Sequence, residues 1–530
     1  MSTEVDAIVI GSGINGLVAT AELAKAGWSV TLVERNDELG GFIATEERTL
    51  PGYRHDTYSS WHPLFVSGAA YAVLGDDLHR HGLEYRNTDG WVTASVADDG
   101  RVTMAHRDPK TTAERFTHDR DRDTYLAKLD AFGAIAEQFG TVMSTELHSP
   151  ATLRTGWKLL RAVGRSRAGE LLRDAVTSGR SYCRREFAGP EVDHLWSPWL
   201  LHAGLSPDHA SGGLMIPVFA ATMHGFGLPV VAGGAARFVE AFRTLFDELG
   251  VTVRTGTEVQ RILLERGRAV GVVAGNEVVR ARRAVLASCS PAALMRDLLP
   301  AGAVETRLAD EAERYRYGRG AMQIHVALSA PLSWREEELG EVPLIHISDG
   351  SASTGIACAQ AEAGLLPAKP TVVVGQQYVL DRTRVPEGAA ALWLQLQEVP
   401  FAPAGDAAGE VDVGRGWSKE LADAFAQRVL DRVAAHAPDL KQKVRAIDVV
   451  TPADLAAYNV NAVHGDPYGG SAELDQNFLW RPTPAGGRHA VLPGLWHIGA
   501  ATHPGPGLGG GSGHLVAQRL INRRLRRRQP

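Results

Sequence analysis

The sequence predicts an α/β fold built around a parallel sheet, and three observations support this prediction. The first is the stretch Asp6–Gly41, in which an apolar run, a glycine turn, a helix-forming segment and a second apolar run follow one another. The second is residues 233–288, where helix-like and strand-like segments alternate again. The third is an apolar run followed by many glycines near the C-terminus, residues 494–520. Alternating strands and helices favour a parallel sheet covered by helices.

Residues 6–41 carry the parts of a βαβ unit in order. The apolar run Ala7–Ile10 predicts a buried strand, and Leu17–Ala26 has the composition of a helix that ends beside a glycine. A second apolar run, Ser29–Val33, predicts the next strand and stops at Glu34. The alternative is an ordinary α/β turn that happens to be rich in glycine, but such a turn does not require all these parts together.

The glycines between the first strand and the helix point to a ligand. Gly11, Gly13 and Gly16 follow the pattern G-x-G-x-x-G, which allows a tight turn, close approach of the backbone to a pyrophosphate and close helix–strand packing. The start of the helix offers free N–H groups to phosphates. Glu34 can accept hydrogen bonds from ribose hydroxyls, and its charge would repel a 2′-phosphate. We therefore predict a dinucleotide site, which also includes the neighbouring residues Ser12, Ile14, Asn15 and Arg35.

Length and composition limit the classes of protein. At 530 residues the chain can form two or three domains, and a net charge of −6 does not favour nucleic acid as a partner. Cys183, Cys289 and Cys358 are too far apart in sequence for a disulfide framework, a metal cluster or a redox dithiol. We therefore predict no metal site. The sequence shows neither a signal peptide nor an apolar run of about 20 residues that could span a membrane, and cytoplasmic location is expected.

Further motifs carry a resemblance to a known family. Gly40-Gly41 lies directly beyond the acid, and residues 494–520 read GLWHIGAATHPGPGLGGGSGHLVAQRL, with Thr502–Gly505 as their most specific part. Residues 233–288 form a third matching stretch between these two. Together these segments resemble the flavin-containing amine oxidase superfamily, and in particular its phytoene desaturase and carotenoid isomerase-like branch.

The resemblance implies FAD as the cofactor and assigns residues to it. Gly40 and Gly41 would let the chain pass close to FAD, Val259 would place its backbone on the adenine, and Gly499 would approach the pyrophosphate. The backbone N–H groups of Leu508, Gly509 and Gly510 would bind the flavin O2 and stabilise negative charge on the reduced ring. His503 is the best candidate for a catalytic polar group near the ring. The alternative for His503 is a structural role, with its imidazole bound to backbone.

In fold terms the resemblance implies a discontinuous Rossmann-type FAD-binding domain with an inserted α+β substrate domain. The FAD-binding domain would comprise residues 1–90, 228–290 and 485–530. The substrate-binding domain, with a helical cap, would comprise residues 91–227 and 291–484.

One segment departs from the family pattern. Relatives often carry Asp followed by Thr-Gly-Pro beside the isoalloxazine ring, whereas here Asp56-Thr57 is followed by Tyr58 and Ser59. Two interpretations remain open. Either a side chain instead of bare backbone faces the flavin, or the loop leads away from the cofactor.

The apolar segment Trp196–Phe226 is expected to line a substrate pocket. Its polar residues are candidates for orienting a substrate, although helix packing is the more ordinary role for each: His202, Asp208, His209 and His224. Farther on, His464 and Tyr468 lie in a glycine-rich stretch, and either could reach the same cavity.

Two basic segments suggest contact with a membrane surface. The helix predicted at Leu153–Ala168 contains five basic residues and no acid, with Trp157 among its apolar residues, and the chain ends RRLRRRQP. A basic helix with aromatic and leucine content can lie in a membrane surface. The other interpretation is a solvated basic face, so contact with the inner face of the membrane is an alternative to a purely cytoplasmic location.

Three functions are compatible with the sequence. The first is a phytoene desaturase-like FAD enzyme that desaturates, saturates or isomerises a C–C bond of an apolar isoprenoid or polyene, as in carotenoid biosynthesis. The second is a flavin amine oxidase acting on a C–N bond. It is weakened because the strand predicted at Gly320–Leu328 lacks the lysine of many such enzymes, and because no cysteine follows Cys358 to link a flavin. The third is a non-catalytic FAD-binding assembly or interaction protein. The electron acceptor (oxygen, a quinone or NAD(P)) and the oligomeric state stay open.

Overall fold

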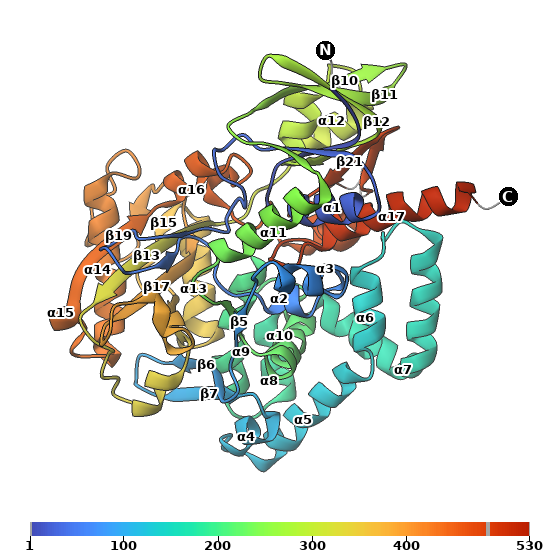
Figure 1. Ribbon diagram of the computed structural model, residues 1–530. Coiled ribbons are helices and arrows are strands. Elements are labelled where there is room, and N and C mark those ends of the chain that lie inside the picture. The colour runs from blue at the N-terminus through green and yellow to red at the C-terminus, as the bar shows by residue number, and fades with distance from the viewer. Residues whose placement is uncertain (1–2, 484–487, 529–530) are drawn as a thin grey trace.

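A computed structural model describes residues 3–483 and 488–528 and confirms the predicted α/β fold, with two large sheets surrounded by helices (Figure 1). Strands of the first sheet come from residues 3–33, 252–288 and 490–498, and strands of the second from residues 91–106 and 320–450. The chain thus enters and leaves the first sheet more than once. The limits of the two domains stay a prediction.

The first sheet has a parallel core. Its strands lie in the order β21 (Leu495–Ile498), β12 (Glu277–Ser288), β1 (Thr3–Ile10), β2 (Val30–Val33) and β9 (Thr252–Arg254), all parallel. The hairpin β10 (Val259–Glu265) and β11 (Arg268–Ala274) adds antiparallel strands to the first half of β12, and β20 (Ala490–Leu492) pairs with β21. The sequence pattern predicts a hairpin of residues 268–273 with 277–279 and a separate strand at 284–286. The pairing of β11 with β12 confirms the hairpin, whereas β12 continues without a break through both predicted strands.

Helices cover this sheet with a continuous apolar core. The helices that contribute to it are α1 (Ile14–Lys25), α3 (Ala69–Arg80), α11 (Ala236–Leu249) and α17 (Gly511–Arg528). In α11, Phe238, Phe242 and Phe246 are fully buried, which the spacing of four residues along one helix face explains. The opposite face of the sheet holds a second cluster that includes α12 (Thr306–Glu313) and the turn Ala293–Leu298.

The second sheet is mixed. Its order is β19 (Val444–Val450), β13 (Gly320–Leu328), β17 (Ala390–Val399), β16 (Val372–Gly375), β14 (Leu344–Ile347), β6 (Trp91–Val96) and β7 (Val102–His106). Only the β14–β6 pair is parallel. One face packs its leucines, isoleucines and valines against α14 (Lys419–His436), whose first turn is capped by the Ser418 side chain.

A line of directly opposed residues crosses the other face of this sheet. Gln323 on β13 lies opposite Gln395, Gln395 opposite Val373, Val373 opposite His346, and His346 opposite Ser95. Because opposed residues point to the same side, these five side chains share one face. We call this line the polar row.

Helices between β7 and β8 (Val230–Val231) form the helical part of the molecule, seen at the bottom and right of Figure 1. They are α4 (Pro109–Glu114), α5 (Asp119–Gly133), α6 (Ala136–Met143), α7 (Pro150–Val176), α8 (Gly179–Glu186), α9 (Glu191–Trp196), the 3₁₀ turn Pro198–Ala203 and α10 (Gly212–Phe226). The spacing of apolar residues in 121–147 predicts a single helix, but the structure has two, α5 and α6, because the chain turns at Ile135 and buries that side chain.

The basic segment predicted at 153–168 lies within α7, which bends at Gly164 (φ 74°). On this helix Trp157 is 65% exposed. The side chains of Lys158, Arg165, Arg167 and of residues 523–530 lie outside the described part of the structure. Of the helices described, none is both long and apolar enough to cross a membrane.

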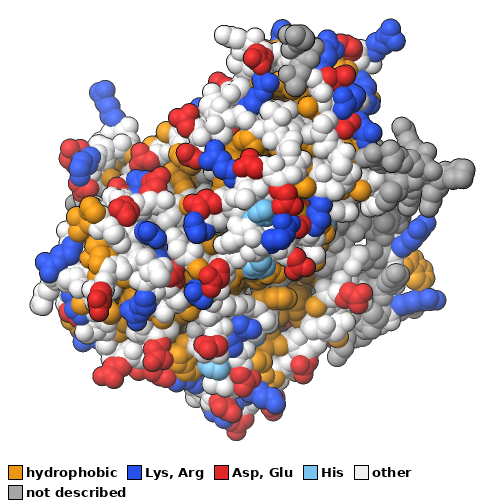
Figure 2. All heavy atoms as spheres, in the orientation of Figure 1, with side chains coloured by type: hydrophobic (Ala, Val, Ile, Leu, Met, Phe, Trp, Pro, Cys, Tyr) orange, Lys and Arg blue, Asp and Glu red, His pale blue; other side chains and the backbone are white. Residues whose placement is uncertain are grey.

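The remaining elements are short. They are β3 (Thr45–Glu46), β4 (His55–Asp56), α2 (Pro63–Val66), β5 (Tyr85–Arg86), α13 (Ser351–Glu362), β15 (Leu365–Leu366), β18 (Gly405–Asp406), α15 (Leu440–Lys443) and α16 (Pro452–Tyr458), with 3₁₀ turns between them. Lys, Arg, Asp and Glu side chains are distributed over the face shown in Figure 2, with hydrophobic side chains between them.

Candidate active site

The glycine turn after β1 brings strand and helix into direct contact. A β-carbon at Gly16 would lie 1.9 Å from the carbonyl oxygen of Gly11, so only glycine fits there. Gly11 has φ +89° and donates its N–H to the carbonyl of Val33 (2.8 Å). At Gly13, in contrast, a β-carbon would meet nothing within 4 Å. The turn is therefore tight on its inner side and open at Gly13.

The open side of this turn carries unpaired donors. Among the described residues, the backbone N–H groups of Gly13, Ile14, Asn15 and Gly16 make no hydrogen bond, and the first turn of α1 has no acidic residue. Unpaired N–H groups at a helix start attract negative charge. The residues present thus fit the phosphates of a dinucleotide.

A second helix start lies beside the first. The N–H of Gly513, in the first turn of α17, donates to Oδ1 of Asn15 at 3.1 Å, although the two residues are 498 positions apart. A β-carbon at Gly510 would lie 2.6 Å from Val18, so α1 and the turn before α17 touch. In the described part of the chain, the N–H groups of Leu508, Gly509 and Gly510 also have no partner. The free N–H groups at the start of α1 and those just before α17 therefore lie close together.

Glu34 stands at the end of β2 next to the turn. It is buried, and its Oε2 accepts hydrogen bonds from the N–H (2.8 Å) and hydroxyl (2.7 Å) of Ser12, while Oε1 accepts from the N–H of Asn36 (2.9 Å). The Ser12 hydroxyl in turn accepts from the N–H of Gly40 (3.1 Å). These bonds hold the turn, the acid and the glycine doublet as one unit.

The other residues predicted to bind the cofactor surround this unit. Gly41 has φ +58°, and a β-carbon there would lie 3.2 Å from Gly13, so the doublet passes directly over the turn. Arg35 is exposed, Val259 is the first residue of β10, and a β-carbon at Gly499 would lie 3.1 Å from the hydroxyl of Ser288. Their contacts with a cofactor stay a prediction.

Asp56 is a site residue whose partners the sequence did not reveal. Its Oδ2 lies 2.8 Å from Nη1 of Arg384 and also accepts a hydrogen bond from Ser60, while its Oδ1 accepts from the N–H of Ala235 (2.7 Å) and the hydroxyl of Thr45 (2.8 Å). Both members of the ion pair are buried. Arg384 also lies 3.3 Å from the buried carboxylate of Asp381, which accepts from the N–H of Gly233 (2.7 Å).

The segment after Asp56 is held against β13. Nε2 of Gln323 donates to the carbonyl of Tyr58 (3.0 Å), and Nε2 of His325 lies 3.1 Å from the carbonyl of Thr57. The Tyr58 ring stacks on Tyr458 with 4.7 Å between ring centres. Burial lowers the pKa of His325 well below its usual value, so its ring is neutral.

The polar row contains buried atoms without partners. Among the described residues, Oε1 of Gln323 and Nδ1 of His346 make no hydrogen bond, and neither does Nε1 of the neighbouring Trp199 or Trp393. Buried polar atoms are normally paired, so unpaired ones gathered at one face indicate a place for a ligand or water. This face, turned toward the segment at Tyr58, is the candidate substrate face.

Of the polar residues expected from Trp196–Phe226, one lies at this face. His202 pairs with His346, with 3.1 Å between their Nε2 atoms. Asp208 forms an ion pair with Arg180 (2.5 Å), and His209 lies 3.7 Å from Glu362, both outside the face.

The remaining sequence candidates have other partners. His224 bonds to the hydroxyl of Tyr125 (2.7 Å) and to the carbonyl of His106 (2.8 Å), which is a packing role. Tyr468 accepts from Nε2 of Gln397 (2.7 Å), whereas His464 is exposed and contacts surface rings.

His503 is buried against the helical part of the molecule. Its Nε2 lies 3.1 Å from the carbonyl of Val142 in α6, and its own carbonyl accepts from His489 (2.8 Å). Burial lowers the pKa of His503 to about 4, so the imidazole is neutral at physiological pH. These contacts match the structural alternative for this residue. Its catalytic role stays a prediction.

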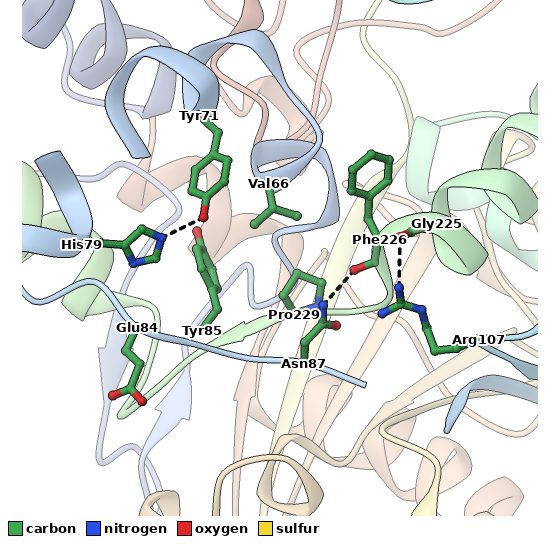
Figure 3. A pocket seen from close by; sticks show the side chains of 10 residues that line it. All are labelled: Val66, Tyr71, His79, Glu84, Tyr85, Asn87, Arg107, Gly225, Phe226 and Pro229. Atoms are coloured by element: carbon green, nitrogen blue, oxygen red, sulfur yellow. Dashed lines mark hydrogen bonds between the residues drawn. The ribbon is translucent and has the colours of Figure 1, made fainter. Parts of the chain in front are cut away.

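Two surface pockets lie outside the glycine turns. One, of about 480 Å³, is lined by residues that include Tyr71, His79, Asn87 and Arg107 (Figure 3). Its polar groups bond to one another or to backbone: Tyr71 to His79 (2.7 Å), Asn87 to the carbonyl of Phe226 (2.8 Å) and Arg107 to that of Gly225 (3.0 Å). The other, of about 670 Å³, lies next to Glu34 and is lined by residues 35–39 and 43–46. Within the described residues, no group of three or more His, Cys, Asp or Glu side chains is arranged to hold a metal ion.

Comparison with known proteins shows which family and which relatives the chain resembles. The model of the family described as flavin containing amine oxidoreductase matches residues 14–413. The chain is 25% identical over 565 residues to pyridine nucleotide-disulfide oxidoreductase domain-containing protein 2 of Mus musculus, covering 98% of this chain and 95% of that protein. It is also 25% identical over 523 residues to 4,4'-diapolycopene oxygenase of Methylomonas sp, with 97% of each chain covered. Further relatives are named phytoene desaturase and carotenoid 3,4-desaturase.

Solved structures show the same fold. An oxidoreductase from Methanosarcina mazei superposes with a TM-score of 0.61 at 14% identity, covering 97% of this chain and 100% of that one. At this level of identity the likeness concerns the fold alone.

Proposed function

The chain belongs to the flavin containing amine oxidoreductase family, and on that basis we propose that it acts on a carbon–carbon bond of a long apolar substrate, such as a polyene or another isoprenoid. Membership confirms the resemblance predicted from the glycine motifs. The protein is a FAD-dependent oxidoreductase, and FAD is its cofactor. The type of bond and the class of substrate are the proposal.

The observation that carries the proposal is the set of side chains that β13 presents. On the face toward Tyr58 this strand presents Gln323 and His325, and it contains no lysine. Amine oxidases of the kind that rely on a lysine on this strand, beside the flavin, need a residue that β13 does not have. The names of the carotenoid-processing relatives add support, since several of them refer to polyene chemistry.

The surroundings of the substrate face suit an apolar molecule. Helix α10 brings Met215 and Phe219, and the turn before it brings Trp199, into one apolar cluster with Trp393 of β17. Such a wall holds a hydrocarbon by burial and excludes water from the reacting bond.

The residues of the chain have separate roles in the proposed reaction. Bound FAD supplies hydride acceptance and release. The free N–H groups before α17 would hold negative charge on bound FAD, Glu34 and Ser12 would hold its dinucleotide end, and Gln323 and His325 fix the segment at Tyr58 against β13. No described side chain has to act as a nucleophile in this scheme.

The test is an anaerobic titration of the FAD-loaded protein with candidate substrates, monitored through the absorption band of the flavin. We expect a polyene to bleach the band of the oxidised flavin, and reoxidation by oxygen, a quinone or NAD(P)⁺ to identify the acceptor. Bleaching by primary amines and not by polyenes would replace the proposal with a C–N oxidase. A flavin that no substrate reduces would favour a non-catalytic binding protein.

For location we propose a cytoplasmic protein that touches the inner face of the membrane through α7. The exposed apolar side chains of this helix support the proposal: Trp157 (65%), Leu172 (71%) and Val176 (63%). Co-sedimentation with anionic vesicles should fall several-fold in the variant Trp157→Ser, and equal sedimentation of the two proteins would refute the contact.

A further inference from the structure

We propose that His202 donates a hydrogen bond from Nδ1 to an oxygen atom at one end of the apolar substrate, and that His346 fixes the tautomer of His202 that makes this possible. The inference rests on the proposed function, since it assigns an oxygen-bearing class of substrate to the same face. It starts from the contact between two imidazoles on elements 144 residues apart in sequence.

Both rings of the pair are neutral. Burial lowers the pKa of His202 to about 3 and that of His346 well below its usual value. A neutral imidazole has one N–H donor and one acceptor nitrogen. With 3.1 Å between the two Nε2 atoms, one of them must carry the proton and the other must accept it.

The hydrogen-bond partners of His346 determine which of the two rings donates the proton. Nδ1 of His346 is buried and has no partner among the described residues. If His202 donated, His346 would carry its proton on Nδ1 and leave a buried N–H unpaired. An unpaired buried N–H is rarer and costlier than an unpaired acceptor. His346 therefore donates from Nε2, and His202 carries its own proton on Nδ1.

The donor of His202 faces accessible space. Its Nδ1 makes no hydrogen bond within the described residues and is not among the fully buried atoms, and the residue keeps intermediate exposure. The ring is held in orientation by Trp199, which stacks on it at 4.6 Å with an interplanar angle of 30°. A single oriented N–H donor among apolar side chains selects a ligand with an oxygen acceptor.

The position of the pair along the sheet sets the geometry of the ligand. His346 and Gln323 belong to the polar row and are separated by β17 and β16. Three strand spacings of about 4.8 Å place them roughly 14 Å apart. A long molecule lying across the row can thus have one end at His202 while a bond farther along lies near Gln323 and Tyr58. The substrate class is an elongated apolar molecule with a terminal carbonyl, carboxyl or hydroxyl oxygen.

The experiment compares retinal with its deoxygenated hydrocarbon as probes, by quenching of tryptophan fluorescence in the FAD-loaded protein. We expect retinal to bind about five- to tenfold more tightly than the hydrocarbon, as the loss of one hydrogen bond predicts. His202→Phe keeps the ring stacked on Trp199 and should remove this difference. His202→Asn places an amide near the position of Nδ1 and should retain it, whereas His202→Gln, which reaches toward His346, should not.

Two further measurements separate recognition from general effects. The imidazole ¹⁵N shifts of His202 should report a protonated Nδ1 in the wild type and a mixture of tautomers in His346→Leu. His209→Gln changes a histidine outside the substrate face and should bind both probes as the wild type does. Equal affinity of the wild type for both probes, or an equal loss of both in His202→Phe, would overturn the inference and leave the proposed function intact. Failure of the wild type to bind either probe would overturn the proposed function itself.

Discussion

Nη1 of Arg384 lies 2.8 Å from Oδ2 of Asp56, and this buried pair ties the short strand β4 to a loop of the second sheet. The aspartate follows the glycine doublet and bonds to Thr45 and Ala235, while the arginine comes from the loop between β16 and β17 and donates to the carbonyl of Val231 (2.7 Å). Since the segment that follows Asp56 also contacts β13, the pair and this segment together hold the chain beyond the glycine doublet against the second sheet.

Breaking this pair should destabilise the whole protein. In Asp56→Asn the buried Arg384 keeps only the longer ion pair with Asp381 (3.3 Å), and removal of one partner of a buried pair costs up to about 3–5 kcal/mol. We expect thermal unfolding at a clearly lower temperature. Arg237→Gln removes an exposed pair with Glu240 and should change stability by less than about 1 kcal/mol. If the two variants unfold at the same temperature, the buried pair has no special role.

Gly13 should be required for the cofactor and not for the fold. A β-carbon there meets no protein atom, so Gly13→Val should change the free energy of unfolding of the FAD-free protein by less than about 1 kcal/mol. The added side chain points into the space where the phosphates are expected, so FAD affinity should fall at least about tenfold, or ~1.4 kcal/mol. The flavin-to-protein absorbance ratio measures this.

Gly16→Ala provides the contrast, because its β-carbon collides with Gly11 and should unfold the turn itself. Gly133 is the last residue of α5, and a β-carbon there would meet nothing within 4 Å. Gly133→Ala should therefore change neither the stability of the protein nor its affinity for FAD. Normal FAD content in Gly13→Val would place the phosphates elsewhere.

Glu398 should make stability depend on pH. Burial raises the pKa of this carboxyl to about 7, against the hydrogen bonds it accepts from the N–H groups of Thr371 (2.6 Å) and Gln397 (3.1 Å). A raised folded-state pKa means that the folded protein binds more protons, so stability falls as the pH rises from about 4.5 to 7. Glu398→Gln should flatten this decline in urea unfolding series at pH 5 and pH 8.

The exposed Glu387 supplies the control, since Glu387→Gln leaves the buried carboxyl in place. It should show the same decline as the wild type. An unchanged decline in Glu398→Gln would mean that another group is responsible.

His503 should act on the helical part of the molecule. Its Nε2 contacts the carbonyl of Val142, so His503→Ala should speed amide hydrogen exchange in α6. We expect the rate of flavin reduction by a saturating substrate to change by no more than about fivefold, since one lost hydrogen bond of this kind is worth only about 1 kcal/mol. A fall of a hundredfold with unchanged exchange would instead support the catalytic role predicted from the sequence.

The βαβ unit could be predicted because its signals are local. The strand, the glycines and the acid at Glu34 lie within one short stretch, and the structure places each element within a few residues of its prediction. The pair Thr451-Pro452 likewise predicts a helix start from adjacent residues, and the structure begins α16 there with a capping box of Thr451 and Asp454.

The continuity of β12 was missed for a physical reason. Arg280, Arg282 and Arg283 interrupt its apolar residues, which suggested a break between two strands. In the structure these arginines stay on the strand because Arg280 pairs with Glu265 (2.5 Å) and Arg282 and Arg283 pair with Asp6 (3.3 and 3.1 Å). Carboxylates on β10 and β1 therefore pair with these arginines, and the local sequence pattern does not show such partners.

The interior of the site could not be predicted at all. Asp56 and Arg384 are 328 residues apart, and His202 and His346 are 144 apart, so no local pattern connects them. His202 was a candidate by residue type. What distinguishes it from His209 and His224 is the neighbouring strand, which only the folded chain supplies.

The meeting of Asn15 with Gly513 has a consequence for biosynthesis. On a translating ribosome Asn15 leaves the exit tunnel 498 residues before Gly513, so the donors of α1 and those before α17 cannot meet until α17 has emerged. A chain halted before that point holds only one of the two sets of donors, and its flavin site is incomplete.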